Sequence, residues 1–220
     1  MQRLRVTFAR GEATKYITHL DTMRFWERAL RRARLPVAQT QGFHPHPRIA
    51  LAAPMPVGIT GEAELMDVFL DEPVTPSRFL ERLAAQMVAG IEVLDVETVD
   101  VETPSLQALM RCAEYRVTVE SDRTLEDVRA SIEALLKAES FPWEHLRDGS
   151  LRQYDLRPQV AHLAVAAADE GRYVLAMRLQ TDSKAAGRPE QVARALGFSE
   201  RPLAIHRVRL ELAEGTPLRR

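Results

Sequence analysis

The chain has 220 residues, of which 45% are hydrophobic and 28% charged, a composition typical of a folded globular protein. It contains no apolar run of the ~18 residues that a membrane span needs, and its N-terminal residues lack the pattern of an export signal. The single cysteine, Cys112, excludes an intramolecular disulfide and a cluster held by several thiolates of this chain. We therefore expect a cytoplasmic protein with no cofactor of its own.

The net charge of −1 hides an uneven distribution along the chain. Residues 1–60 hold ten Lys or Arg against three Asp or Glu, whereas residues 61–105 hold two Arg against eleven Asp or Glu. Blocks of opposite sign are typical of surfaces that meet a charged partner.

The hydrophobic periodicity of the first half predicts the order strand, helix, strand, strand, helix, strand. Thr18 and Thr75 precede the two helical patterns as N-cap candidates, and Gly90 is a stop signal for the second helix. The expected ranges are strands 3–10, 49–53, 65–70 and 91–99 and helices 17–36 and 74–90.

The same order recurs in the second half of the chain. The expected ranges are strands 113–121, 152–156, 160–167, 172–180 and 203–212 and helices 124–138 and 188–198, with 152–156 also compatible with a loop. This repetition predicts an α+β protein of two tandem ferredoxin-like (β-α-β-β-α-β) domains with antiparallel sheets. We place the domains at residues 1–104 and 105–220.

The first helix has two chemically different faces. At about 100° per residue, Met23, Trp26, Leu30 and Ala33 share one face, and a set of arginines shares the opposite one. The set is Arg24, Arg28, Arg31 and Arg32. One interpretation is an ordinary solvated face. Because arginine suits bidentate phosphate contacts, binding of RNA or another polyanion is an equal alternative.

The segment "QGFHPHPRIALAAPMPVG", residues 41–58, follows this helix. His44 and His46 alternate with prolines and would point the same way in an extended chain. A zinc site needs three or four ligands, and the sequence nearby supplies no cysteine and no His/Glu pair at helical spacing, so we expect no metal. We interpret the segment as a proline-stiffened loop that faces an anion through Phe43, His44, His46 and Arg48.

Other candidate residues are scattered along the chain. His19 follows the Thr18 cap, where it either contacts a phosphate or completes the cap. Asp155 and Arg157 in "YDLRP" and Arg188 in "GRP" are candidates in the second half, and an internal Asp–Arg pair is an equally good explanation of the first two. Signatures of nucleotide-binding loops, serine hydrolases and zinc proteases are absent from the sequence.

Several of these stretches together resemble a known family, the bacterial radical-SAM-linked proteins. The similarity lies in "ITHLDTMRFWERALRRARLPVAQTQGFHPHPRIALAAPMPVGI", in "EAELMDVFL" through Glu64 and Asp67, and in "YDLRP" and "GRPEQV". Gln39-Thr40-Gln41 departs from the Tyr-Ser that usually enters the loop. The resemblance implies a partner radical-SAM enzyme, which would carry the iron–sulfur cluster, S-adenosylmethionine and a cobalamin-like group, and it implies no established activity.

Three hypotheses follow for the function. The leading one is an RNA-binding accessory module that recognises the substrate of a separate radical-SAM enzyme in RNA modification or processing. The second is a metal-independent RNA-processing enzyme that uses His19, His44 or His46 as general acid or base. The third is a protein-docking module without RNA. We expect neither membrane attachment nor DNA specificity.

Overall fold

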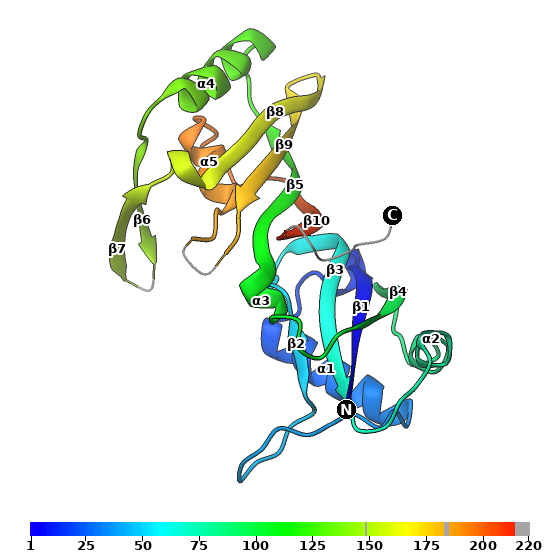
Figure 1. Ribbon diagram of the computed structural model, residues 1–220. Coiled ribbons are helices and arrows are strands. Elements are labelled where there is room, and N and C mark those ends of the chain that lie inside the picture. Colours follow the sequence, from blue (N-terminus) through cyan, green and yellow to red (C-terminus); the bar gives the residue numbers. More distant parts are fainter. Residues whose placement is uncertain (148, 183–184, 214–220) are drawn as a thin grey trace. The chain divides into compact units, whose positions relative to one another are not determined.

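The computed structural model describes residues 1–147, 149–182 and 185–213 (Figure 1). The chain divides into two compact units, one formed by Met1–Met110 with Leu212 and Ala213, and the other by Arg111–Glu211. It is a mixed α+β protein in which β1 pairs antiparallel with β3 and β4, β2 with β3, β5 and β8 with β9, and β6 with β7. None of the helices in the described ranges is long and apolar enough to cross a membrane.

The first unit contains a sheet with strand order β4-β1-β3, and β2 pairs with β3. Its strands are β1 (Gln2–Arg10), β2 (Ile49–Leu51), β3 (Ile59–Leu70) and β4 (Ile91–Val99). Its helices are α1 (His19–Arg32), α2 (Pro76–Ala84) and the short α3 (Leu106–Leu109). A 3-10 turn, η1 (Glu12–Thr14), lies between β1 and α1 in sequence.

The core of this unit lies on one face of the sheet. Leu4, Val6 and Phe8 alternate along β1 and pack against α1, where Trp26 is fully buried. Phe8 and Trp26 meet edge to face with ring centroids 4.9 Å apart, a favoured aromatic geometry. Phe79 and Leu83 of α2 join the same cluster, so both helices cover the face to which the even positions of β1 point.

The second unit has the strand order β10-β5-β9-β8. These strands are β5 (Met110–Glu120), β8 (Val160–Asp169), β9 (Arg172–Gln180) and β10 (Ala204–Leu212). Its helices are α4 (Leu125–Lys137) and α5 (Pro189–Ala195), and a 3-10 turn, η2 (Arg157–Gln159), precedes β8. A separate two-stranded hairpin of β6 (Pro142–Arg147) and β7 (Ser150–Asp155) lies between α4 and β8 in sequence.

Most element predictions from the sequence are confirmed, with two main differences besides the earlier start of β3, at Ile59, and the short helix α3, which was not predicted. The side chains of Thr18, Thr75 and Thr124 cap α1, α2 and α4. However, α2 ends at Ala84 and not at Gly90. Gly90 instead precedes β4, where its carbonyl accepts hydrogen bonds from the Gly11 N–H (2.8 Å) and the Thr14 hydroxyl (2.9 Å).

The second difference is the strand β6, which the sequence analysis missed. Its run "PWEHLR" begins with proline and carries three charged or titratable side chains, so it lacks the apolar alternation of a core strand. It forms through pairing with β7, the segment for which a loop was the alternative. Gly149, with φ of +75°, lies in the turn between them.

Candidate functional site

Helix α1 presents a row of arginines to solvent. The Thr18 hydroxyl accepts a hydrogen bond from the Asp21 N–H (3.2 Å), and Ala29 and Leu30 are buried on the core side. The residues on the opposite side are exposed: Arg24, Arg28, Arg31 and Arg32. Their common exposure follows from the helical spacing predicted from the sequence.

This arginine row is only weakly neutralised. Arg24 lies 3.6 Å from the carboxylate of Asp21, which the Thr18 hydroxyl also contacts. These hydrogen bonds from Thr18 and the nearby positive charges of Arg24 and Arg28 lower the pKa of Asp21. In the part of the chain that the structure describes, Arg28, Arg31 and Arg32 form no ion pair. The row therefore retains positive charge at its C-terminal end.

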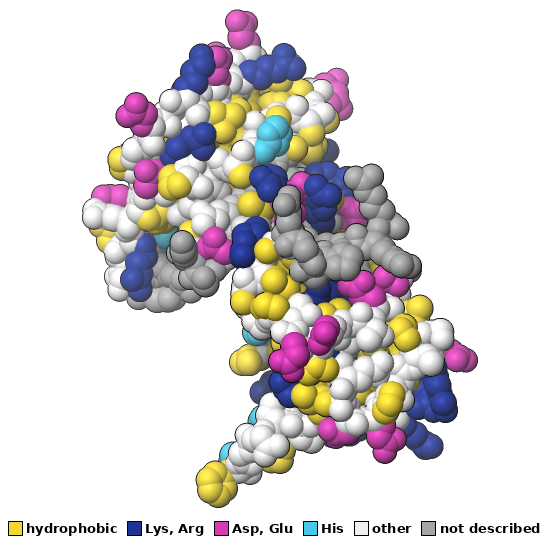
Figure 2. Space-filling model, viewed as in Figure 1, with side chains coloured by type: hydrophobic (Ala, Val, Ile, Leu, Met, Phe, Trp, Pro, Cys, Tyr) yellow, Lys and Arg dark blue, Asp and Glu magenta, His cyan; other side chains and the backbone are white. Residues whose placement is uncertain are grey.

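Residues 39–47 form a narrow hairpin, here called the finger, which projects from the first unit (Figures 1 and 2). The Thr40 N–H donates to the His46 carbonyl (2.8 Å), and the His46 N–H donates back to the Thr40 hydroxyl (3.0 Å). At the base, the Arg48 N–H donates to the Ala38 carbonyl (2.7 Å). Backbone pairing thus stiffens the loop in addition to its prolines.

The tip of the finger carries an aromatic ring in solvent. Phe43 has an exposed fraction of 103%, and Gly42 before it has φ of +133°, a conformation that glycine adopts readily. His44 and His46 are also exposed. Among the described residues, no three His, Cys, Asp or Glu side chains are grouped in a way that could hold a metal ion.

Arg48 lies at the base of the finger and does not extend along it. Its guanidinium carbon is 4.0 Å from the centroid of the Phe69 ring, and its Nη1 is 3.2 Å from the sulfur of Met1. The side chain is therefore held against β3 by a cation–π contact. It remains exposed, so it can meet a ligand at the base but not at the tip.

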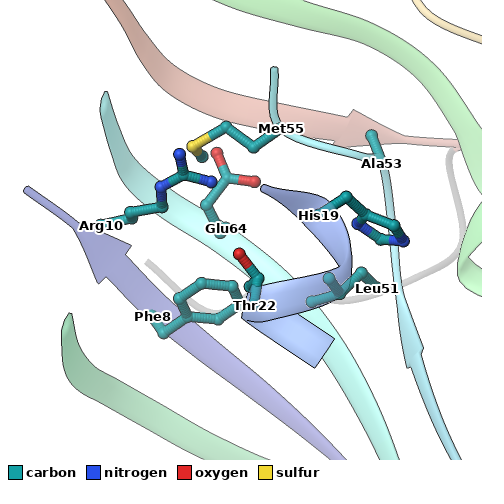
Figure 3. Close-up of a pocket in the computed structure, with 8 residues that line it drawn as sticks. All are labelled: Phe8, Arg10, His19, Thr22, Leu51, Ala53, Met55 and Glu64. Carbon is teal, nitrogen blue, oxygen red and sulfur yellow. The ribbon is translucent and has the colours of Figure 1, made fainter. Parts of the chain in front are cut away.

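A small cavity lies near the end of β1, the start of β3 and the start of α1 (Figure 3). Its volume is about 10 Å³, space for roughly one water molecule. Arg10 and Glu64, which are 1% and 3% exposed, both line it, and Figure 3 shows the guanidinium of Arg10 directed toward the carboxyl of Glu64. Gly61 leaves room for this carboxyl, since a Cβ there would lie 2.6 Å from Oε1 of Glu64.

Arg10 was not among the residues predicted from the sequence, and Glu64 was named there only for the family resemblance. The sequence nevertheless contains a signal for both residues, namely a charge at an inward position of a strand. Arg10 continues the inward alternation of Val6 and Phe8 along β1, and Glu64 stands directly opposite Phe8 on β3. A charge at an inward strand position is unusual enough to mark a buried polar site. Arg10 also donates to the carbonyls of Lys15 (2.8 Å) and Ile17 (3.3 Å).

His19 lies at the mouth of this cavity. It is exposed, and in Figure 3 its imidazole is directed toward Leu51 and Ala53 and away from the Arg10 guanidinium. Neither His44 nor His46 lines the cavity. The structure thus does not gather the three histidines in this pocket.

A second buried charge cluster lies on the other face of the β1–β3 pair. Asp67 accepts hydrogen bonds from Nε of Arg3 (2.9 Å) and Nε of Arg5 (2.9 Å), and all three residues are at most 2% exposed. Arg3 also donates to the carbonyls of Thr103 and Pro104. The guanidinium group of Arg3 thus ties the sheet to the segment before α3, whereas that of Arg5, among the described residues, donates hydrogen bonds to Asp67 alone.

Two of the candidates in the second unit, Asp155 and Arg157, form hydrogen bonds at the base of the β6–β7 hairpin. Asp155 accepts hydrogen bonds from the N–H groups of Phe141 (2.8 Å) and Arg157 (2.9 Å), which lower the pKa of its carboxyl. The Arg157 side chain donates to the carbonyls of Leu136 (3.1 Å) and Val160 (2.8 Å). Asp155 therefore joins the two ends of the hairpin, and Arg157 joins the end of α4 to the start of β8.

Arg188 is placed differently. It is half-buried at the N-cap position of α5, where its side chain forms no cap hydrogen bond. Its positive charge acts on Tyr154 of the hairpin, where it partly offsets the rise that burial causes in the pKa of the phenol.

A match over most of the sequence identifies the family of the chain. The model of an uncharacterized protein family conserved in bacteria, DUF2344, matches residues 3–189. The chain belongs to this family. The DUF2344 match includes the arginine row, the finger and the β6–β7 hairpin, and it ends at the first residue of α5. None of the curated proteins matches the sequence.

Solved structures resemble this DUF2344 protein in fold. The Cbf5-Nop10-Gar1 complex has a TM-score of 0.51 at 9% identity, covering 95% of this chain and 48% of the other. The archaeal box H/ACA sRNP Nop10-Cbf5 complex has 0.47 at 11%, with coverages of 96% and 48%. An H/ACA RNP bound to a substrate RNA containing 2'-deoxyuridine has 0.47 at 10%, with coverages of 93% and 47%.

The present chain spans about half the length of the chains it matches. At 9–11% identity the likeness concerns the fold alone.

Proposed function

We propose that this DUF2344 protein binds single-stranded RNA through its first unit. The observation that carries the proposal is the row of exposed arginines on α1, three of which form no ion pair in the described residues. Guanidinium groups contact phosphates in a bidentate manner, and phosphate contacts supply most of the affinity of proteins for nucleic acids. The row is followed in sequence by the finger, so charge and an aromatic contact come from adjacent segments.

The finger supports a single-stranded ligand. Unpaired bases stack on exposed aromatic rings, and Phe43 is a fully exposed ring on a hydrogen-bonded hairpin. His44 and His46 offer further planar, hydrogen-bonding groups on the same hairpin. Arg48 would contact the ligand at the base of the finger.

We further propose that each unit is a ferredoxin-like domain, divided near residues 104 and 105. The supporting observation is that the sheet order in each unit places the first strand between the fourth and the third, with the second strand beyond the third.

We also propose a cytoplasmic location and a separate radical-SAM enzyme as partner, which would carry the iron–sulfur cluster, S-adenosylmethionine and cobalamin. The support for this partner is the resemblance of residues 17–59.

Binding to labelled single-stranded RNA tests the function. We expect Phe43→Ala to weaken binding by about fivefold or more, since stacking contributes about 1–3 kcal/mol per base. We expect Arg28→Gln with Arg31→Gln to weaken it by about tenfold or more, since two phosphate contacts are lost. Matched controls are Arg129→Gln with Arg201→Gln, which removes the same charge from exposed sites in the second unit, and Tyr16→Ala, which removes another exposed ring. Equal affinities for all five proteins would contradict the proposal.

The same preparations test whether the protein is an enzyme. RNA incubated with the protein, with and without chelator, is expected to stay intact under conditions in which it is bound. Cleavage that resists the chelator and disappears in His44→Ala would show instead a metal-independent RNA-processing enzyme.

A further inference from the structure

The β6–β7 hairpin occupies the same topological position in the second unit as the finger does in the first. The finger lies between α1 and β2, and β2 pairs with β3. The hairpin lies between α4 and β8, and β8 pairs with β9. In each unit, therefore, a hairpin is inserted between the first helix and the next strand of the main sheet, and Figure 1 shows both inserts projecting from their units.

One face of the β6–β7 hairpin combines aromatic and cationic side chains. Trp143 pairs with Tyr154 in the ladder, and His145 pairs with Arg152 two residues further on, so all four side chains point to the same face. The His145 and Tyr154 rings meet edge to face at 5.6 Å, which agrees with this placement. Trp143 and Tyr154 are half-buried and Arg152 is exposed.

The hairpin is held firmly at its base. The Nε1 of Trp143 donates to Oε1 of Gln191 on α5 (2.8 Å), which fixes the indole ring. The carboxylate of Asp155 accepts the Phe141 N–H, and the Leu156 N–H donates to the Phe141 carbonyl (2.9 Å). A preorganised aromatic side chain loses little conformational entropy when a ligand stacks on it.

The charges around this face favour an anionic ligand. Arg152 is exposed on it, and Arg188 lies close enough to Tyr154 for its positive charge to lower the pKa of the phenol. The acidic residues of the two strands, Glu144 and Asp155, belong to the other face, where Glu144 accepts a hydrogen bond from Gln153. Asp155 at the base already accepts two backbone N–H groups.

We propose that this face is a second RNA-contact site, at which an unpaired nucleotide stacks on the Trp143–Tyr154 pair while Arg152 contacts its phosphate. The proposal rests on the RNA binding proposed for the first unit. It extends the site to residues outside that unit and assigns the two inserted hairpins the same role. Aromatic side chains on which bases stack, together with positive charges that follow the phosphates, are the features that bind single-stranded nucleic acids without regard to sequence.

Intrinsic fluorescence provides a direct test, because the chain contains two tryptophans. Trp26 is fully buried in the first unit, so a base that stacks on a tryptophan must stack on Trp143. We expect unlabelled single-stranded RNA to quench the fluorescence of the full chain, and Trp143→Phe to abolish the quenching. We expect Arg152→Gln to weaken RNA binding about threefold to tenfold in fluorescence anisotropy with labelled RNA, the usual scale for one phosphate contact.

The two proposals fail in different ways. RNA that binds by anisotropy without quenching, and with the same affinity for Arg152→Gln, would overturn the second site and leave the first. Quenching that persists in Trp143→Phe would also overturn it, since the signal would come from Trp26. Absence of RNA binding by the unmodified chain would overturn both. Unchanged RNA affinity together with loss of a co-purified protein in Arg152→Gln would identify a protein-docking face instead.

Discussion

Individual charged residues at inward strand positions organise the first unit. Arg10 and Glu64 interrupt the apolar alternation on the helix side of the sheet, whereas Arg3, Arg5 and Asp67 lie on the other side. Nη1 of Arg5 has no hydrogen-bond partner among the described residues. The carboxylate of Asp67 is thus the charged partner of both guanidinium groups, Arg3 and Arg5. A buried charge that loses its partner is strongly unfavourable.

This dependence predicts that Asp67→Asn destabilises the protein. The substitution keeps the shape of the side chain but removes the negative charge between Arg3 and Arg5. We expect the free energy of unfolding to fall by about 3–5 kcal/mol, as for other buried pairs that lose one partner. Asp71→Asn, on an exposed residue just after the same strand, is the control and should change it by less than about 0.5 kcal/mol. Similar urea midpoints for both variants would contradict the prediction.

At the scale of the elements, the two inserted hairpins differ in how they are attached. The finger is held by main-chain pairing and by the Thr40 hydroxyl, whereas the β6–β7 hairpin depends on the carboxylate of Asp155 at its base. Hydrogen bonds from two N–H groups favour the charged form of the carboxylate, and the pKa of Asp155 is accordingly lowered.

The lowered pKa predicts a pH dependence of stability. A carboxyl whose pKa is lower in the folded than in the unfolded chain stabilises the fold above its ordinary pKa of 3.8, and this stabilisation is lost as the pH falls through the folded value. Asp155→Asn, which is neutral at every pH, should be less stable than the unmodified protein at pH 7, and the difference should shrink below about pH 4. Urea unfolding at pH 7 and pH 3 measures it, and a difference that stays constant would contradict the assignment.

For the molecule as a whole, the sequence predicted what depends on periodicity and local capping. It predicted the α+β class, the exposed arginine row and the Thr18 cap, because each follows from spacing along one segment. It did not predict the meeting of Arg10 with Glu64, or the hairpin face of Trp143 and Tyr154, because these depend on strand register. A register is set by pairing between segments far apart in the chain and has no local signal.

The charge distribution leads to a last prediction, on salt. Since the net charge is −1, attraction of RNA must come from local groups of arginines, of which the row on α1 is the largest that we propose, and not from the charge of the whole protein. If the four arginines each contact a phosphate, the slope of log K against log salt should be about −3, so binding should weaken about 50-fold between 50 and 200 mM salt. With Arg28→Gln and Arg31→Gln the slope should halve, and the same change of salt should weaken binding only about sevenfold.

The double variant Arg129→Gln with Arg201→Gln separates the effect of the row from that of the overall charge. It lowers the net charge of the protein by the same amount as Arg28→Gln with Arg31→Gln, but at exposed residues of the second unit. We expect it to keep the full slope, since a loss of net charge alone releases no counterions from the RNA. Binding isotherms at four salt concentrations suffice for the comparison. A slope near zero for the unmodified protein, or equal slopes for both double variants, would mean that the α1 arginines do not contact phosphates, and the aromatic finger would then have to account for the affinity.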